Sequence, residues 1–223
     1  MARKPKRPER RTDALSRERI VQAAIELLDA EGEDGLTFRA LAAHLATGAG
    51  ALYWHVANKE ELLAAAVDDL AAGVMSTVGE DAAPADRIRA VALGLFDAID
   101  AHPWAGAQLS RAPWQSATLQ IFERIGAQLK ALRVPERKQF FVASTLVSYV
   151  LGVAGQNAAN ARDPAHGGDR ERFLATAAAR WSELDPVKYP FVRRVAGQLR
   201  DHDDRAQFLA GIDLILAGMA TVR

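Results

Sequence analysis

The stretch from Leu36 to Leu63 constrains the fold more than any other, because it combines two very short helical patterns with a tight turn between them. Thr37 is a favourable N-cap, and helical spacing follows it at Phe38, Leu41, Ala42 and Leu45. Residues 46–48 leave room for little more than a turn. The next pattern, 49–55, is a helix of about two turns, which is too short to be stable alone in water. It must pack against neighbouring helices, and Leu52 and Val56 are the expected anchors.

The residues of this second short helix that do not pack are suited to DNA. Small side chains at its start allow close approach to base edges in the major groove, and the polar side chains that follow can donate hydrogen bonds to phosphates. Arg39, on the preceding helix, has a guanidinium group that matches O6 and N7 of guanine. The candidate DNA-binding residues are Thr37, Arg39, Ala49, Gly50, Ala51, Tyr53, Trp54, His55 and Lys59.

The segment LTFRALAAHL followed by ALYWHVANKEELL resembles the helix-turn-helix of the TetR family of transcriptional regulators, over about residues 16–70. The resemblance implies a ligand-responsive repressor that binds a palindromic DNA operator as a homodimer. It also implies an all-α fold, with an N-terminal three-helix DNA-binding domain and a larger helical ligand-binding and dimerisation domain. The alternative is a helical dimeric ligand-binding or scaffold protein without sequence-specific DNA binding.

The charge is neutral overall but unevenly distributed. Within residues 1–11, six basic residues face a single acidic one, and two prolines oppose a helix there. Such an arm can lie along DNA or remain a solvated tail, and the sequence favours neither. We therefore expect a basic flexible arm at 1–13, a DNA-binding domain at 14–62 and a regulatory and dimerisation domain at 63–223.

Helical periodicity continues to the C-terminus, with no sustained alternation of the kind that predicts strands. The segment 113–132 is predicted to bury Trp114, Leu119, Phe122, Ile125, Leu129 and Leu132. The segment 140–154 is apolar on almost every face and is expected to be buried on both sides. Prolines at 186 and 190 indicate an irregular crossing before a last helix at 204–220.

The helices predicted at 136–160 and 204–220 carry more apolar surface than a monomer readily hides, so we expect them to pair with a second copy in a four-helix interface. A purely intramolecular core is the alternative. Aromatic and amide side chains near the helix breaks are typical of a small-molecule pocket, although each alone can equally be core filler. The candidate pocket residues are Trp104, Gln108, Trp114, Phe122, Tyr149, Asn157 and Asn160. They favour an apolar or aromatic inducer.

Several other classes of protein are disfavoured. The chain lacks cysteine, and it contains no HExxH, GxSxG, P-loop or dinucleotide fingerprint, so we expect neither an enzyme nor a bound metal or cofactor. Its basic N-terminus lacks the apolar segment of a secretory signal, and no apolar run approaches membrane-spanning length. We therefore expect a cytoplasmic protein with no membrane partner.

Overall fold

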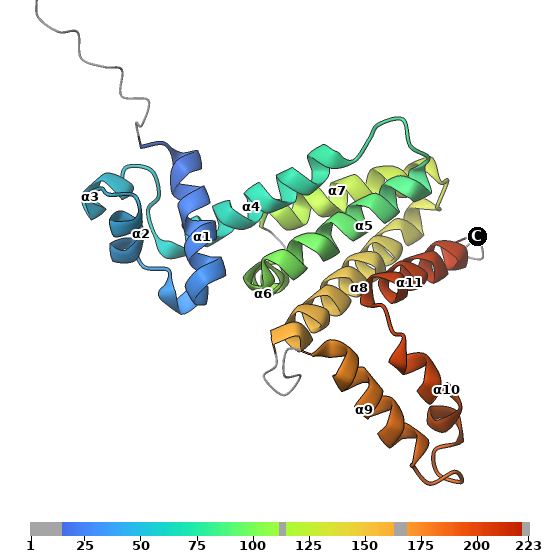
Figure 1. Cartoon of the computed structure of the whole chain (residues 1–223). Helices are drawn as coiled ribbons and strands as arrows, with labels where there is room; N and C mark the ends of the chain where they lie inside the picture. The colour runs from blue at the N-terminus through green and yellow to red at the C-terminus, as the bar shows by residue number, and fades with distance from the viewer. Residues whose placement is uncertain (1–14, 112–114, 163–168, 220–223) are drawn as a thin grey trace, which may run out of the picture. The chain divides into compact units, whose positions relative to one another are not determined.

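The computed structural model describes residues 15–111, 115–162 and 169–219, and every regular element in these residues is an α-helix, which confirms the predicted fold class (Figure 1). The helices are α1 (Arg17–Gly35), α2 (Phe38–His44), α3 (Ala49–Leu52), α4 (Lys59–Thr77), α5 (Pro84–Ala101), α6 (Pro103–Arg111), α7 (Ser116–Ala131), α8 (Glu136–Arg162), α9 (Arg170–Ser182), α10 (Pro190–Arg200) and α11 (Asp204–Met219). The chain divides into two compact units between Ala66 and Val67, inside α4.

Helix α1 begins and is interrupted where its sequence predicts. The Ser16 hydroxyl oxygen accepts a hydrogen bond from the backbone N–H of Arg19 at 3.3 Å, which satisfies one of the N-terminal donors of the helix. Gly32 has φ 72°, a left-handed conformation that glycine adopts without steric penalty, and it breaks the regular helix three residues before the last turn ends. Between these two points, a stripe led by Ile20 and Leu28 is fully buried.

The turn between α2 and α3 is a Schellman motif. The Thr37 hydroxyl caps α2 by accepting from the N–H of Ala40 at 3.1 Å. At the other end, Ala46 N–H donates to the Ala43 carbonyl at 3.1 Å and Thr47 N–H to the Ala42 carbonyl at 2.9 Å. Ala46 takes the left-handed position of this motif, with φ 50°. The chain therefore reverses within a few residues and places α3 directly against α2.

The first turn of α4 is fixed to α1. The Asn58 side chain accepts from the N–H of Glu61 at 2.8 Å, as an N-cap does. The Glu61 carboxylate in turn accepts from the N–H of Ala57 at 2.9 Å and pairs with Arg17 on α1 at 3.2 Å. Lys59 donates to the Glu33 carbonyl near the end of α1. These contacts close the N-terminal unit around the buried side chains of α1 to α4.

The core of the second unit lies where α5, α8 and α11 meet. The inner face of α5 consists of six buried residues at helical spacing, namely Ile88, Val91, Ala92, Leu95, Phe96 and Ile99. Phe208 on α11 is fully buried and stacks between Phe96, at a centroid distance of 4.6 Å, and Tyr149 on α8, at 5.6 Å. The Tyr149 hydroxyl donates to the Phe208 carbonyl at 3.1 Å. Three segments distant in sequence are joined by this stack.

Helix α7 corrects two expectations. It begins at Ser116 rather than at Pro113, and residues 112–114, Trp114 included, lie outside the described residues. Leu119 and Leu132 are 56% and 38% exposed, so the predicted stripe was wrong at these positions. The face that packs is instead formed by Ala117, Thr118, Ile121, Ile125, Gln128 and Leu129. These six recur at helical spacing, and the face was obscured because two of them are polar.

Helix α8 is not buried on both sides within one chain, which contradicts the sequence expectation. Val142, Leu146 and Val150 pack inward, whereas Phe140 and Phe141 are 70% and 69% exposed. By length and composition alone, α8 is also long and apolar enough to cross a membrane. However, it packs against α5, α6, α7 and α11, as the central helix of a helical bundle does.

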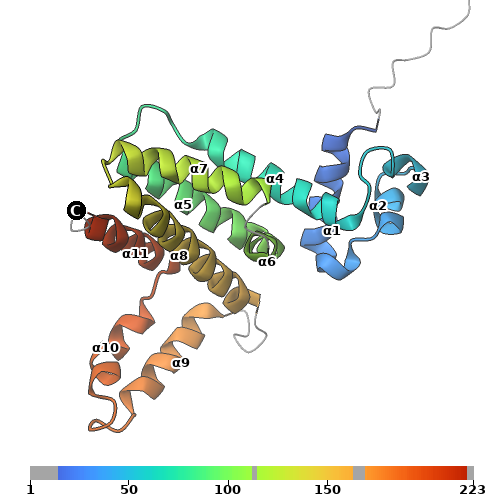
Figure 2. The same cartoon turned by 180° about the vertical axis from the view of Figure 1, so that it is seen from behind.

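Helices α9 and α10 pack against each other and extend from the end of α8 as a pair (Figures 1 and 2). The irregular crossing predicted around residues 186–190 is therefore only partly present, because Pro190 opens the eleven-residue helix α10. Proline is favourable at the first position of a helix, where no intrahelical N–H bond is lost. The same residue can thus indicate either a break or a start.

Candidate nucleic-acid interface

Helix α3 is held by one buried side chain within it and one shortly after it. Leu52 is fully buried, and Val56, four residues further along the chain, is 2% exposed. Ala49 and Gly50, at the start of the helix, are exposed, and Ala51 is half-buried. The structure thus confirms the predicted anchors. It also shortens the predicted helix, because residues 53–55 form a turn.

Most of the predicted contact residues lie on the surface of the N-terminal unit. Thr37 and Arg39 are exposed on α2, and His55 is half-buried after α3. The Thr37 hydroxyl oxygen accepts the capping bond, so its hydrogen is still able to point to a phosphate. The guanidinium of Arg39 is carried on a helix capped at one end and closed by the Schellman turn at the other. Its backbone position is therefore well defined.

The two aromatic residues after α3 differ in their surroundings. Tyr53 is 57% exposed and stacks on Phe38, with ring centroids 4.5 Å apart and an interplanar angle of 6°. This contact fixes the ring against α2 and leaves its hydroxyl edge for another partner. Trp54 is 90% exposed, so almost none of its surface contributes to the fold. A tryptophan so exposed is unusual unless it binds something.

Lys59 has a structural role that the sequence did not indicate. Its ammonium group donates to the Glu33 carbonyl, and the residue is half-buried. An ammonium group has three donors, so this bond leaves capacity for a phosphate. Replacement of Lys59 would nevertheless remove a contact between α1 and α4 as well. It is therefore a less informative test of DNA binding than Arg39 or Trp54.

Two side-chain contacts that support this surface were missed by sequence reasoning. His44 on α2 lies 2.7 Å from Glu26 on α1, and Arg17 pairs with Glu61 across α1 and α4. The two residues of each contact are 18 and 44 positions apart, so no local pattern could reveal them.

At the start of α1, the pKa of Glu18 lies below its usual value, because its carboxylate accepts hydrogen bonds from its own backbone N–H and from Ser16. The basic arm at 1–13 lies outside the described residues.

The candidate pocket residues that the structure describes lie on α6, α7 and α8 of the second unit. Trp104 and Gln108 are buried on α6, and Phe122 on α7 is half-buried. Tyr149 belongs to the stack around Phe208. Asn157 and Asn160 line a cavity of about 620 Å³ at the end of α8, together with residues from α5, α9, α10 and α11. Sequence reasoning missed the charged members of that lining, namely Asp100, Arg170 and Asp204.

Two protein-family models match the chain, one on each unit. Residues 20–66 match the model described as "Bacterial regulatory proteins, tetR family". Residues 80–223 match the model described as "Tetracyclin repressor-like, C-terminal domain". The first match contains the helices of the surface described above, and the second contains α5 to α11.

Individual relatives agree over almost the whole length. The chain is 30% identical over 219 residues to an HTH-type transcriptional regulator of Saccharopolyspora erythraea, covering 97% of this chain and 89% of that protein. It is 53% identical to SCO7222, a TetR from Streptomyces coelicolor, with a TM-score of 0.86 and coverage of 93% and 99%. ActR from Streptomyces coelicolor, solved in complex with actinorhodin, is 25% identical, with a TM-score of 0.75 and coverage of 93% and 97%.

Proposed function

The chain belongs to the TetR family of bacterial transcriptional regulators, and on this premise we propose that it is a homodimeric repressor released from a palindromic operator by a small-molecule inducer. One observation carries the DNA-binding half of this proposal. Helix α3 buries Leu52 completely, while the start of the helix and the adjacent Trp54 are open to a partner. A protein of this class acts in the cytoplasm and needs neither catalysis, a cofactor, a metal nor a membrane.

In the proposed complex, Arg39 binds guanine, and residues 49–51 lie against base edges. Ala51 is suited to a thymine methyl group. Tyr53, Trp54, His55, Thr37 and Lys59 hold the phosphates on either side. Because residues 49–51 are small, direct readout is limited, and we infer that Arg39 and the shape of the duplex carry much of the specificity.

The exposed apolar surfaces of α8 and α11 support the proposed homodimer. An apolar groove between these helices is lined by Phe141, Val142, Ile215 and Met219 among others. Leu214 on α11 is 76% exposed, and Phe140 and Phe141 on α8 are similarly open. Apolar helix faces of this size favour association with a matching surface. An isologous four-helix interface between two copies of the chain would cover these faces. It would place the two copies of α3 about 34 Å apart, or a multiple of that distance, to match the two half-sites of the operator.

Induction is proposed to act through α4. This helix contributes residues to both units, since the division between them falls within it. In one conformation of the dimer, the spacing of the two N-terminal units does not fit the two half-sites of the operator. A ligand that binds this conformation more tightly shifts the population away from the DNA-binding state. ActR, crystallised with actinorhodin, supports a ligand for this chain. The candidate pocket residues Trp104, Gln108, Trp114, Phe122, Tyr149 and Asn157 remain predictions and favour an apolar or aromatic inducer.

The decisive experiment is selection of bound duplexes from a random pool by the purified protein at fixed salt. A palindromic consensus is expected. Replacement of Arg39 by Ala should then relax specificity at one base pair per half-site, with a loss of about 1–3 kcal/mol for the preferred base. Arg180→Ala, which removes an exposed guanidinium from α9, is the matched control and should leave the consensus intact.

The competing function is a helical dimeric ligand-binding or scaffold protein without sequence-specific DNA binding. A folded dimer that enriches no sequence would favour it. A consensus unaffected by Arg39→Ala would preserve the DNA-binding function and refute the role assigned to that side chain. The two outcomes are therefore distinguishable.

A further inference from the structure

The cavity at the end of α8 has the size and construction of a ligand site. It has a volume of about 620 Å³ and is bordered by α5, α8, α9, α10 and α11. Pockets for small organic molecules commonly span about 300–1,000 Å³. Its lining combines apolar side chains, namely Val153, Phe173, Leu174 and Leu199, with charged and amide groups. Such a combination suits an amphipathic molecule.

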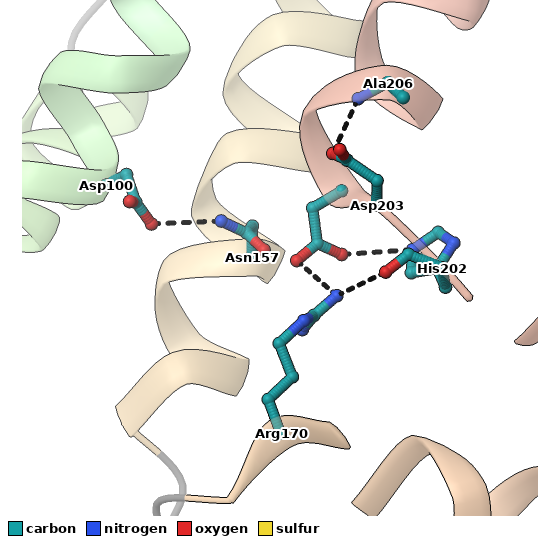
Figure 3. A network of polar contacts seen from close by, with 7 residues as sticks. Asp100, Asn157, Arg170, His202, Asp203 and Ala206 are labelled. Atoms are coloured by element: carbon teal, nitrogen blue, oxygen red, sulfur yellow. Dashed lines mark hydrogen bonds and ion pairs between the residues drawn. The ribbon is translucent and has the colours of Figure 1, made fainter. Parts of the chain in front are cut away.

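The single guanidinium group of the lining is already neutralised. Arg170 lies 2.7 Å from a carboxylate oxygen of Asp204 and donates to the His202 carbonyl at 3.4 Å. The imidazole of His202 lies 3.0 Å from the other oxygen of Asp204 (Figure 3). The adjacent Asp203 caps α11 by accepting from the N–H of Ala206, which lowers the pKa of its carboxyl group. These groups therefore satisfy one another.

Asp100 is different, because no cation balances it among the residues that the structure describes. Its carboxylate accepts one hydrogen bond, from the side-chain amide of Asn157 at 3.0 Å (Figure 3). It lies in the last turn of α5, which holds no basic residue. A negative charge is unfavourable there, because the helix dipole is also negative at its C-terminal end. Asp100 is exposed to solvent, so its carboxylate is accessible to a cation from outside the chain.

We propose that the cavity binds an amphipathic organic cation, with its ammonium or amidinium group beside Asp100 and its apolar body against Val153, Phe173 and Leu174. Arg170 pairs with Asp204, which leaves the Asp100 carboxylate without a paired cation in this lining, and this charge selects a cation over an anion of the same shape. The role of this molecule as an inducer rests on the proposed function. Its binding does not.

The binding test uses three fluorescent probes with the same aromatic body, namely 1-pyrenemethylamine, 1-pyrenemethanol and 1-pyrenecarboxylate. Each is titrated with the full-length protein in the absence of DNA, and the anisotropy of pyrene emission is followed. The amine is expected to bind most tightly and the carboxylate most weakly. Equal affinity for all three, or preference for the carboxylate, would overturn the proposal.

Three variants locate the site. Asp100→Asn keeps the shape and a hydrogen-bond acceptor for Asn157, and should weaken the amine about fivefold to tenfold with little effect on the alcohol. Asp86→Asn removes an exposed carboxylate from the same helix about 21 Å away, and should change neither. Gln156→Trp places an indole in the cavity from an exposed position and should weaken amine and alcohol alike.

An Asp100→Asn protein that binds the amine as tightly as the parent would refute the site, provided that its thermal unfolding midpoint is unchanged. Release of operator DNA is measured separately, with the duplex recovered by selection. Probe binding without release would retain the cation site and reject its role in induction. Release without the predicted effect of Asp100→Asn would retain induction and reject this site.

Discussion

Replacement of Trp54 by Ala should separate DNA binding from folding. The residue is 90% exposed, so about a tenth of its surface is covered by the protein. A tryptophan can bury roughly 200 Å², and a tenth of that is about 20 Å², which corresponds to about 0.5 kcal/mol at 25 cal/mol per Å². We therefore expect the free energy of unfolding to fall by no more than about 0.5 kcal/mol.

The expected effect on DNA is larger. A hydrogen bond from the indole N–H to a phosphate involves a charged acceptor and contributes about 1.5–3 kcal/mol, which corresponds to a roughly tenfold to hundredfold change in the dissociation constant. Trp54→Phe retains an aromatic ring without the donor, and should lose most of the same affinity. Because tryptophan carries no charge, the dependence of the dissociation constant on salt should keep its slope in both variants.

The assay is fluorescence anisotropy with a labelled duplex from the selection, at several salt concentrations, beside urea unfolding followed by circular dichroism. Leu52→Ala is the contrasting control, because its fully buried side chain makes a loss of about 2–5 kcal/mol in stability the expected result. The reasoning is refuted if Trp54→Ala binds DNA within twofold of the parent, or if it lowers stability as much as Leu52→Ala does.

Two further predictions concern positions where one methyl group has opposite effects. Ala46→Gly should stabilise the protein by about 1 kcal/mol, because Ala46 has φ 50°, whereas Ala43→Gly, within the last turn of α2, should destabilise it by about 0.5–1 kcal/mol. Urea midpoints that move in the same direction for both would contradict this explanation. Gly211→Ala should destabilise the protein by about 1–3 kcal/mol, because the added Cβ would overlap the Tyr149 hydroxyl and ring. In Gly197→Ala, the new methyl group meets no atom within 4 Å, and a gain of about 0.5–1 kcal/mol is expected from helix propensity. Thermal unfolding of the two variants side by side tests the difference.

The N-terminal unit could be predicted closely because its helix boundaries depend on contacts between near neighbours. Ser16, Thr37 and Asn58 each accept from a backbone N–H three positions later, and a residue type at a fixed spacing is enough to indicate such a cap. The exposed residues around α3 could also be predicted from the sequence. A helix so short buries few side chains, so most of its residues stay exposed.

The second unit was predicted less completely because its details depend on contacts between distant residues. The buried face of α7 includes Thr118 and Gln128, which a search for apolar residues passes over. The cavity joins Asp100, Asn157 and Asp204 from three helices, and no spacing along the chain relates them. Gly211 on α11 accommodates the ring of Tyr149 on α8, which is another contact between residues distant in sequence.

The open surroundings of α3 bear on how this regulator can diversify. A Cβ added at Gly50 would meet no other atom within 4 Å, and Ala49 beside it is exposed. A larger side chain at either position therefore leaves the fold of the N-terminal unit unchanged. Stability depends instead on Leu52, on the other face of the same turn. Under the proposed function, substitutions at these two neighbouring codons can therefore change the target sequence without compensating changes in the core.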